Sequence, residues 1–285
     1  MSDDAPLSLF PRHPQTERPG VVQKVGKRTM GAYVQTFGLA ETLLGALASP
    51  FEPGDAARSV ANRLAIRQVF FTGFEALPLV SVIAIFVGAT IVMQMQLMAA
   101  QLPGEMIGRV IVAVVLRELA PLTTATIVAG RSGTAIATEL GNMKANSEIL
   151  ALSSLGIDPL RLIVWPRFVG AIVSVLVLTV YFGIVAIASA YLVGVWLGAS
   201  TFQALQTGFA EALVPEDIAL YFAKAGGLGL FVGWLSCHYG LEVRVSPTEV
   251  PQKASKAVIM SLLTCVIYST VLTAGFYMIV GPPMR

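Results

Sequence analysis

The stretch that decides the fold is residues 116–159, which read LRELAPLTTATIVAGRSGTAIATELGNMKANSEILALSSLGIDP. Its first part places Arg117 and Glu118 side by side inside an apolar run. Charges inside a membrane cost about 2.5–3.5 kcal/mol each on the insertion scale, so they usually mark a cavity or pathway. Its second part, Thr138–Leu155, predicts a polar helix between two apolar runs. Together these features predict a membrane protein that handles a substrate and is driven by another subunit.

The composition supports a membrane protein. Hydrophobic residues make up 55% of the chain, charged residues 13%, and the mean hydropathy is +0.74. Soluble domains usually contain about 25% charged residues. The net charge of +2 predicts no nucleic-acid partner. Cys237 and Cys265 lie in apolar runs and predict neither a disulfide nor a metal site.

The apolar runs predict an all-α polytopic membrane protein with about five transmembrane helices. The predicted spans are approximately 77–97, 110–129, 168–197, 218–235 and 257–280. The fourth is the weakest because Lys224 and several glycines interrupt it. Before the spans, residues 1–22 predict a disordered tail and residues 23–76 predict amphipathic helices at the membrane surface. Residues 77–285 then form the transmembrane domain.

The basic residues predict the orientation of the chain. Most Lys and Arg residues precede the first span or lie in the loops 131–167 and 236–256. The positive-inside rule therefore places the N-terminus and both loops in the cytoplasm. After five spans the C-terminus is expected on the opposite, outer side of the membrane.

Several short motifs within 116–159 carry a family resemblance. They are Arg117-Glu118-Leu119, Pro121, Ala129-Gly130-Arg131, Gly133, Glu139-Leu140-Gly141, Met143-Lys144, Ala151-Leu152 and Gly156-Ile157-Asp158-Pro159. This pattern resembles the MlaE/YrbE permease family, and the likeness extends over approximately 60–285. The family usually has an acidic-Gln pair and then an Asp in the cytoplasmic helix, where this chain has Ser147, Glu148 and Leu150.

The resemblance implies the permease subunit of an ABC transporter in the bacterial inner membrane. Such a permease is a homodimer that binds a cytoplasmic ABC ATPase subunit and a periplasmic MCE-domain protein. It moves phospholipid or a related hydrophobic molecule between the inner and outer membranes. The chain has no Walker A motif, so we expect no enzymatic activity and no cofactor in it. ATP and Mg²⁺ would be bound by the ATPase.

The candidate substrate-binding residues are Arg117, Glu118, Met93 and Leu97. Adjacent residues on a helix point about 100° apart, so Arg117 and Glu118 cannot simply neutralise each other. Either each pairs with another helix and fixes packing, or they line a polar part of a lipid cavity. Methionines at the end of the first span are either ordinary lipid-facing or core residues, or an adaptable wall for acyl chains.

The candidate ATPase-coupling residues lie in or near the polar helix. They are Glu139, Met143, Lys144, Glu148, Leu152 and Asp158. The alternative is a helix that only lies on the membrane surface. For the whole chain, the main alternative is a non-transporting scaffold or assembly subunit. An intramembrane enzyme is disfavoured because the spans lack a protease or transferase constellation.

Overall fold

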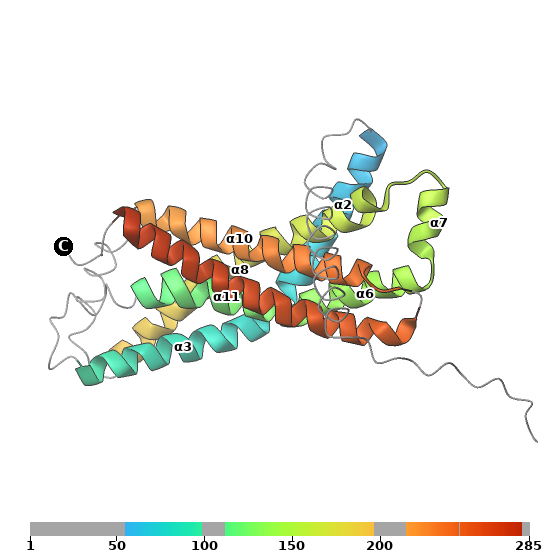
Figure 1. The fold of residues 1–285 in the computed structure, drawn as a ribbon. Helices are drawn as coiled ribbons and strands as arrows, with labels where there is room; N and C mark the ends of the chain where they lie inside the picture. Colours follow the sequence, from blue (N-terminus) through green and yellow to red (C-terminus); the bar gives the residue numbers. More distant parts are fainter. Residues whose placement is uncertain (1–54, 99–111, 197–214, 245, 281–285) are drawn as a thin grey trace, which may run out of the picture. The chain divides into compact units, whose positions relative to one another are not determined.

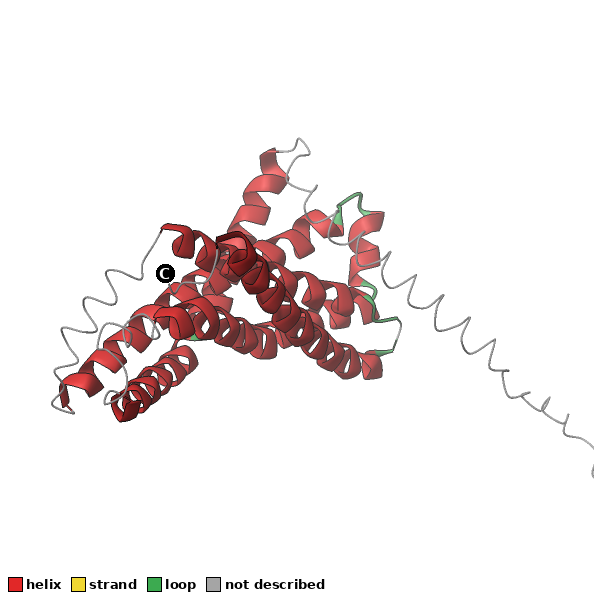
Figure 2. Cartoon of the chain, turned by 60° about the vertical axis from the view of Figure 1, so that its left-hand side comes forward, coloured by secondary structure: helices red, strands yellow, loops and turns green. Residues whose placement is uncertain are grey.

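The structure is a computed structural model that describes residues 55–98, 112–196, 215–244 and 246–280 (Figure 1). These residues form helices joined by short loops (Figure 2). Five helical stretches are long and apolar enough to cross a membrane: 77–95, 113–145, 160–196, 217–241 and 247–278. The all-α, five-span prediction is therefore confirmed. The predicted tail 1–22 and residues 23–54 lie outside the described residues.

The described elements follow one another along the chain as α-helices, three π-helical segments (η2, η3 and η4) and one 3₁₀ turn (η5). They are α2 (Asp55–Phe74), α3 (Leu77–Met98), η2 (Val112–Leu119), α5 (Ala120–Val128), η3 (Ala129–Gly133), α6 (Thr134–Ala145), α7 (Glu148–Ser154), η4 (Leu160–Val164), α8 (Trp165–Trp196), α10 (Pro215–Leu241), η5 (Pro247–Glu249) and α11 (Val250–Val280).

The second span is longer than the sequence predicted. The segments η2, α5, η3 and α6 follow one another without a break, so the helical stretch ends at Ala145 and not near residue 129. The prediction of one polar helix over Thr138–Leu155 is wrong. Ser147 adopts a left-handed backbone with φ 60°, which separates α6 from α7. We call the α6–Ser147–α7 unit the elbow.

The helix α8 is the centre of the bundle and packs against α2, α3, α5 and α10. Its buried face carries Val175, Leu178 and Phe182. Close approach depends on small residues, since helices in a membrane associate through packing. A β-carbon at Gly229 would lie 2.8 Å from the Cα of Ile172, and one at Gly233 would lie 3.0 Å from the Cβ of Ala171.

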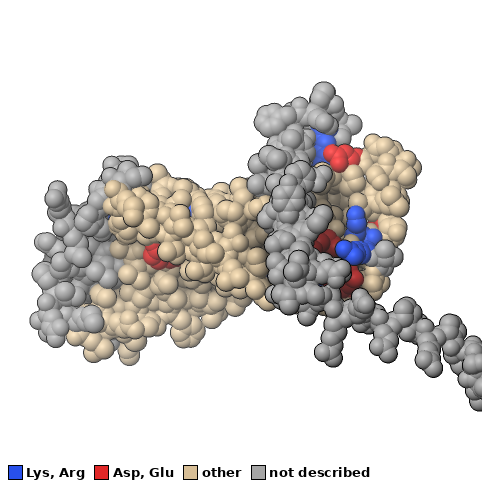
Figure 3. Space-filling model, viewed as in Figure 1, with Lys and Arg blue, Asp and Glu red and all other residues tan. Residues whose placement is uncertain are grey.

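The elbow lies at one end of the bundle (Figure 1), and η4, which follows it, packs against α2. No residue of α7 is buried, and Leu150 and Leu155 are 69% and 74% exposed. On the face shown in Figure 3, charged side chains gather near this end, whereas the middle of the bundle is mostly uncharged. The helix α2 exposes Ile66 and Phe70. Such a surface suits the predicted membrane-surface location of α2, which stays a prediction.

Candidate functional site: paired charges beside an apolar cavity

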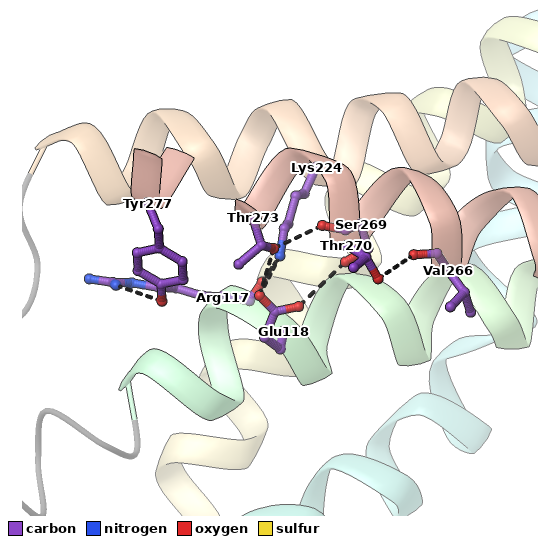
Figure 4. Close-up of polar contacts among 8 residues, drawn as sticks. All are labelled: Arg117, Glu118, Lys224, Val266, Ser269, Thr270, Thr273 and Tyr277. Atoms are coloured by element: carbon purple, nitrogen blue, oxygen red, sulfur yellow. Dashed lines mark hydrogen bonds and ion pairs between the residues drawn. The ribbon is translucent and has the colours of Figure 1, made fainter. Parts of the chain in front are cut away.

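Glu118 on η2 joins three helices through its carboxylate (Figure 4). Lys224 on α10 donates from Nζ to Oε1 at 2.7 Å, and Thr273 on α11 donates to the same oxygen at 2.8 Å. The hydroxyl of Ser269, also on α11, donates to Oε2 at 3.4 Å. The Glu118 side chain is 41% exposed, whereas that of Lys224 is 0% exposed. The ammonium of Lys224 is fully buried, so it needs this ion pair more than the partly exposed carboxylate of Glu118 does.

Pro121 explains the second contact of Lys224. In an α-helix the N–H of residue 121 would bond to the carbonyl of Arg117, but proline has no N–H. Lys224 Nζ donates to that carbonyl oxygen at 2.8 Å. Pro121 therefore leaves a backbone carbonyl available beside the charges, and Lys224 binds it. The ammonium thus binds a carboxylate and a backbone carbonyl from one turn of η2.

Arg117 pairs separately with Asp217 at the start of α10. Its Nη2 donates to Oδ2 of Asp217, and the two side chains are 10% and 8% exposed. Its Nη1 lies 3.5 Å from the hydroxyl of Tyr277 on α11 (Figure 4). The buried Nε of Arg117 has no hydrogen-bond partner among the described residues. The two ion pairs, Arg117–Asp217 and Glu118–Lys224, are called the charge cluster below.

A cavity of about 240 Å³ lies against the Arg117–Asp217 pair, between η2, α8 and α10. Its lining residues are Leu116, Arg117, Val180, Gly183, Ile184, Ile187, Asp217, Ile218, Tyr221 and Phe222. The Tyr221 hydroxyl donates to the carbonyl of Thr179 at 2.6 Å, so its hydrogen is already used. Apart from the ion pair, the wall is apolar or aromatic.

The comparison with known proteins decides the family. The chain matches the family described as Permease MlaE over residues 65–274. It belongs to the MlaE permease family. It is 30% identical over 259 residues to a probable ABC transporter permease protein of Rickettsia conorii, with 90% of this chain and 98% of the relative covered. It is a multi-pass membrane protein of the ABC transporter permease class, and such a permease works with an ATPase subunit.

Two further relatives of this MlaE-family chain have more specific names. The intermembrane phospholipid transport system permease protein MlaE of Haemophilus influenzae is 28% identical over 74% of this chain and 82% of its own length. The chloroplastic protein TRIGALACTOSYLDIACYLGLYCEROL 1 of Arabidopsis thaliana is 28% identical over 78% of this chain and 64% of its own length.

The structure brings only one of the four predicted substrate residues to the cavity of this MlaE-family chain. Arg117 lines it, whereas Glu118, Met93 and Leu97 are not among its lining residues. Met93 and Leu97 lie on α3 and are 46% and 84% exposed. The ion pairs agree with the packing alternative for Arg117 and Glu118, and the cavity agrees with the lining alternative for Arg117. The substrate roles of all four residues stay predictions.

The predicted ATPase-coupling residues divide between the two arms of the elbow and the turn that follows. Glu139, Met143 and Lys144 lie on α6, Glu148 and Leu152 lie on α7, and Asp158 lies in the turn after α7.

Two of these acids have a structural contact. Glu139 accepts from Arg167 Nη2 at 2.9 Å, which ties α6 to the start of α8. Asp158 Oδ1 accepts from the backbone N–H of Leu160 at 3.0 Å and so caps the chain entering η4. Glu148 has only a long contact, 3.4 Å from Asn146 Nδ2. Among the three, Glu148 is therefore the acid most available to a partner, and the coupling roles stay predictions.

Sequence reasoning missed Asp217 and Lys224 as members of the site. Asp217 lies just before the predicted fourth span, and hydropathy treats Lys224 only as an interruption of that span. Seven residues separate them, which is close to two helical turns and puts both on one face of a helix. An acid and a base at that spacing complement the adjacent Arg117 and Glu118. That pattern was the signal available in the sequence.

Proposed function

We propose that this chain is the permease subunit of an ABC transporter that moves phospholipid or a related hydrophobic molecule between the inner and outer membranes. The observation that carries the proposal is the family match, together with the likeness to the intermembrane phospholipid transport permease of Haemophilus influenzae. We further propose that the permease is a homodimer in the bacterial inner membrane and works with a periplasmic MCE-domain protein.

The elbow is the proposed docking site for the ATPase. Its α7 arm has no buried residue and offers Leu150 and Leu155 as exposed apolar side chains. Burying such side chains in a partner's groove is favourable by about 1.5–3 kcal/mol each. The proposal places the N-terminus and the elbow in the cytoplasm, where ATP is available to the partner. The C-terminus is then periplasmic.

The charge cluster lies far from the elbow along α10. Asp217 and Lys224 are near the start of α10, whereas a β-carbon at Gly240, near its end, would lie 2.8 Å from Leu140 of α6. The rise of 1.5 Å per residue puts Asp217 and Gly240 about 35 Å apart. In the proposed orientation the cluster therefore belongs to the periplasmic half of the membrane, where a lipid passes to the MCE partner.

Transport is tested by reconstitution. The permease is co-purified with its cognate ATPase and MCE partner, placed in liposomes that contain radiolabelled phospholipid, and mixed with acceptor liposomes. We expect label to appear in the acceptors, and its rate should depend on ATP. If the complete complex hydrolyses ATP but moves no lipid, the proposal fails, and the scaffold alternative is favoured.

Docking is tested with Glu148→Lys, which changes the charge by two units, and compared with Thr248→Lys in the exposed turn η5, which changes it by one. Like charges facing each other at an interface cost several kcal/mol, so co-purified ATPase should fall about ten-fold or more for Glu148→Lys. Thr248→Lys also ends in a lysine, on a turn that contacts α6 but lies outside the α7 arm, and should retain the ATPase. Equal retention by both variants, at equal membrane abundance, removes Glu148 from the docking surface.

A further inference from the structure

We propose that the cavity beside Arg117 and Asp217 seats one acyl chain of a bilayer phospholipid, which enters from the side between α8 and α10. The proposal deepens the proposed function and rests on it for the later fate of the lipid. Binding in the cavity requires neither the ATPase nor transport.

The rim of the cavity is exposed on the membrane-spanning part of the protomer. Ile184 on α8 is 62% exposed, and Ile218 and Phe222 on α10 are 45% and 48% exposed. All three line the cavity and belong to membrane-spanning stretches. An apolar cavity of roughly 150 Å³ stays dry and takes up apolar molecules, and this one is larger, at about 240 Å³. Lipid chains are the apolar molecules present at such a rim.

Gly183 keeps space open in the wall of the cavity. A β-carbon at this position would lie 2.8 Å from Cδ2 of Leu116 and 3.2 Å from the hydroxyl of Tyr221. Any larger residue would push these two lining side chains out of place. The hydroxyl of Tyr221 is held by the carbonyl of Thr179, so the ring cannot easily swing aside. The packing of α8 against η2 and α10 thus leaves a cleft with a fixed wall.

The Arg117–Asp217 ion pair lies at one side of the otherwise apolar cavity, and a buried polar group at this side favours a lipid over a simple hydrocarbon. The buried Nε of Arg117 has no hydrogen-bond partner among the described residues, although its Nη2 is bound to Asp217. An N–H group left unbonded in a low-dielectric site costs about 1–3 kcal/mol. Nε itself is buried, so an ester or phosphate oxygen of a phospholipid can accept from it only when the Arg117 side chain shifts, while the chain occupies the apolar part.

The charges predict little selection among headgroups. The charge cluster contains two cations, Arg117 and Lys224, and two anions, Glu118 and Asp217, so its formal charge is zero. A neutral cluster attracts an anionic headgroup no more than a zwitterionic one at long range. Phosphatidylglycerol and phosphatidylethanolamine should therefore occupy the cavity to a similar extent.

The experiment uses the full-length permease in nanodiscs of phosphatidylethanolamine and phosphatidylglycerol. A small fraction of the phosphatidylethanolamine carries a diazirine in one acyl chain, and labelled peptides are mapped by mass spectrometry after illumination. We expect label to concentrate on residues 180–187 and 217–222. A phosphatidylglycerol probe with the same chain should give the same map.

Tryptophan substitutions distinguish the cavity from ordinary lipid contact. Ile184→Trp and Ile187→Trp place a larger side chain at the cavity, while Val177→Trp is the matched control. Val177 lies two turns before Ile184 on the same helix, is 58% exposed, and does not line the cavity. Label on residues 217–222 should fall about ten-fold, equivalent to about 1.4 kcal/mol, in both cavity variants and stay unchanged in the control.

Three results would overturn the proposal: equal labelling of all three variants, label spread evenly over the lipid-facing helices, or no label because a second copy of the chain covers the rim. Monodisperse elution and an unchanged melting temperature for each variant ensure that lost label reflects the cavity. Transport separates this inference from the proposed function. If the cavity is labelled but the complex transports no lipid, only the proposed function is contradicted. If the complex transports lipid but the cavity is not labelled, only the acyl-chain site is contradicted.

Discussion

The Glu118–Lys224 pair offers the sharpest energetic test of the structure. Glu118→Leu leaves the ammonium of Lys224 fully buried, with only the carbonyl of Arg117 as a partner. Breaking a buried pair by removing one member costs about 3–5 kcal/mol. A charge near the centre of a membrane helix costs about 2.5–3.5 kcal/mol by insertion measurements. Both estimates predict that Glu118→Leu destabilises the fold by about 3 kcal/mol.

Lys224→Met should cost less, about 1.5 kcal/mol, because a carboxylate that is not fully buried is left in a milder environment. The Glu118 side chain is 41% exposed and keeps the hydroxyls of Thr273 and Ser269 as donors. The double variant contains no unpaired charge and loses only ordinary hydrogen bonds, so it should also cost about 1.5 kcal/mol. The two single changes are therefore not additive, and the coupling energy is about 3 kcal/mol.

The measurement is reversible unfolding of the permease in bicelles, for the parent chain, both single variants and the double variant. Hydrogen bonds between membrane helices average about 0.6 kcal/mol in such cycles. A coupling energy near that average would mean that the pair behaves as a common polar contact, and the argument from a buried unpaired ammonium would be wrong. The order of the single variants is a second check, since Lys224→Met must be the milder change.

Other parts of the chain give three further predictions. A β-carbon at Gly88 would collide with the carbonyl of Ala186, so Gly88→Ala should lower the free energy of unfolding by about 1–3 kcal/mol. Gly275 has open space around it, so Gly275→Ala should leave the stability unchanged. Thermal unfolding in detergent compares the two variants. Ser147→Gly should stabilise the elbow by about 1 kcal/mol in the same assay, because glycine accepts a left-handed backbone without strain. In cells with an opened outer membrane, an impermeant thiol reagent should label Ser200→Cys but not Ser246→Cys; the reverse contradicts the proposed orientation.

The spans could be predicted from length and hydropathy, but their ends could not. The fifth span begins near residue 247 and not at 257, because charged side chains continue the helix through contacts that hydropathy does not register. Lys253 pairs with Glu242 at 3.0 Å, and Lys256 lies 5.0 Å from the ring centroid of Tyr239. Pairing lowers the cost of each charge, so the helix extends past the apolar run.

The break between α6 and α7 could not be predicted from the sequence for a different reason. Helical spacing of apolar residues is compatible with one continuous helix from Thr138 to Leu155, and no proline or glycine interrupts it between Asn142 and Leu155. The break depends on the backbone of Ser147, where a non-glycine residue adopts positive φ. Such a conformation is uncommon for serine and is imposed by the surrounding structure. Periodicity alone therefore could not locate the turn.

The need for partners could be predicted for Arg117 and Glu118, but the identity of the partners could not. Arg117 and Asp217 are 100 residues apart in the chain, and Glu118 and Lys224 are 106 residues apart. Neighbouring residues on one helix point in different directions, so each of the two charges meets a different turn of α10. Which turn it meets depends on how η2 and α5 pack against α10, a tertiary property that local spacing does not contain.

The pairing also constrains how a lipid phosphate can use Arg117 if this permease carries phospholipid. The guanidinium already shares Nη2 with Asp217 and places Nη1 3.5 Å from the Tyr277 hydroxyl, so only Nε is free of a partner among the described residues. A bidentate contact with phosphate needs two parallel N–H groups, and it therefore requires Asp217 to move away. Asp217 begins α10, whose far end packs on α6 of the elbow. Moving Asp217 away from Arg117 would therefore involve a helix that contacts both the charge cluster and the elbow.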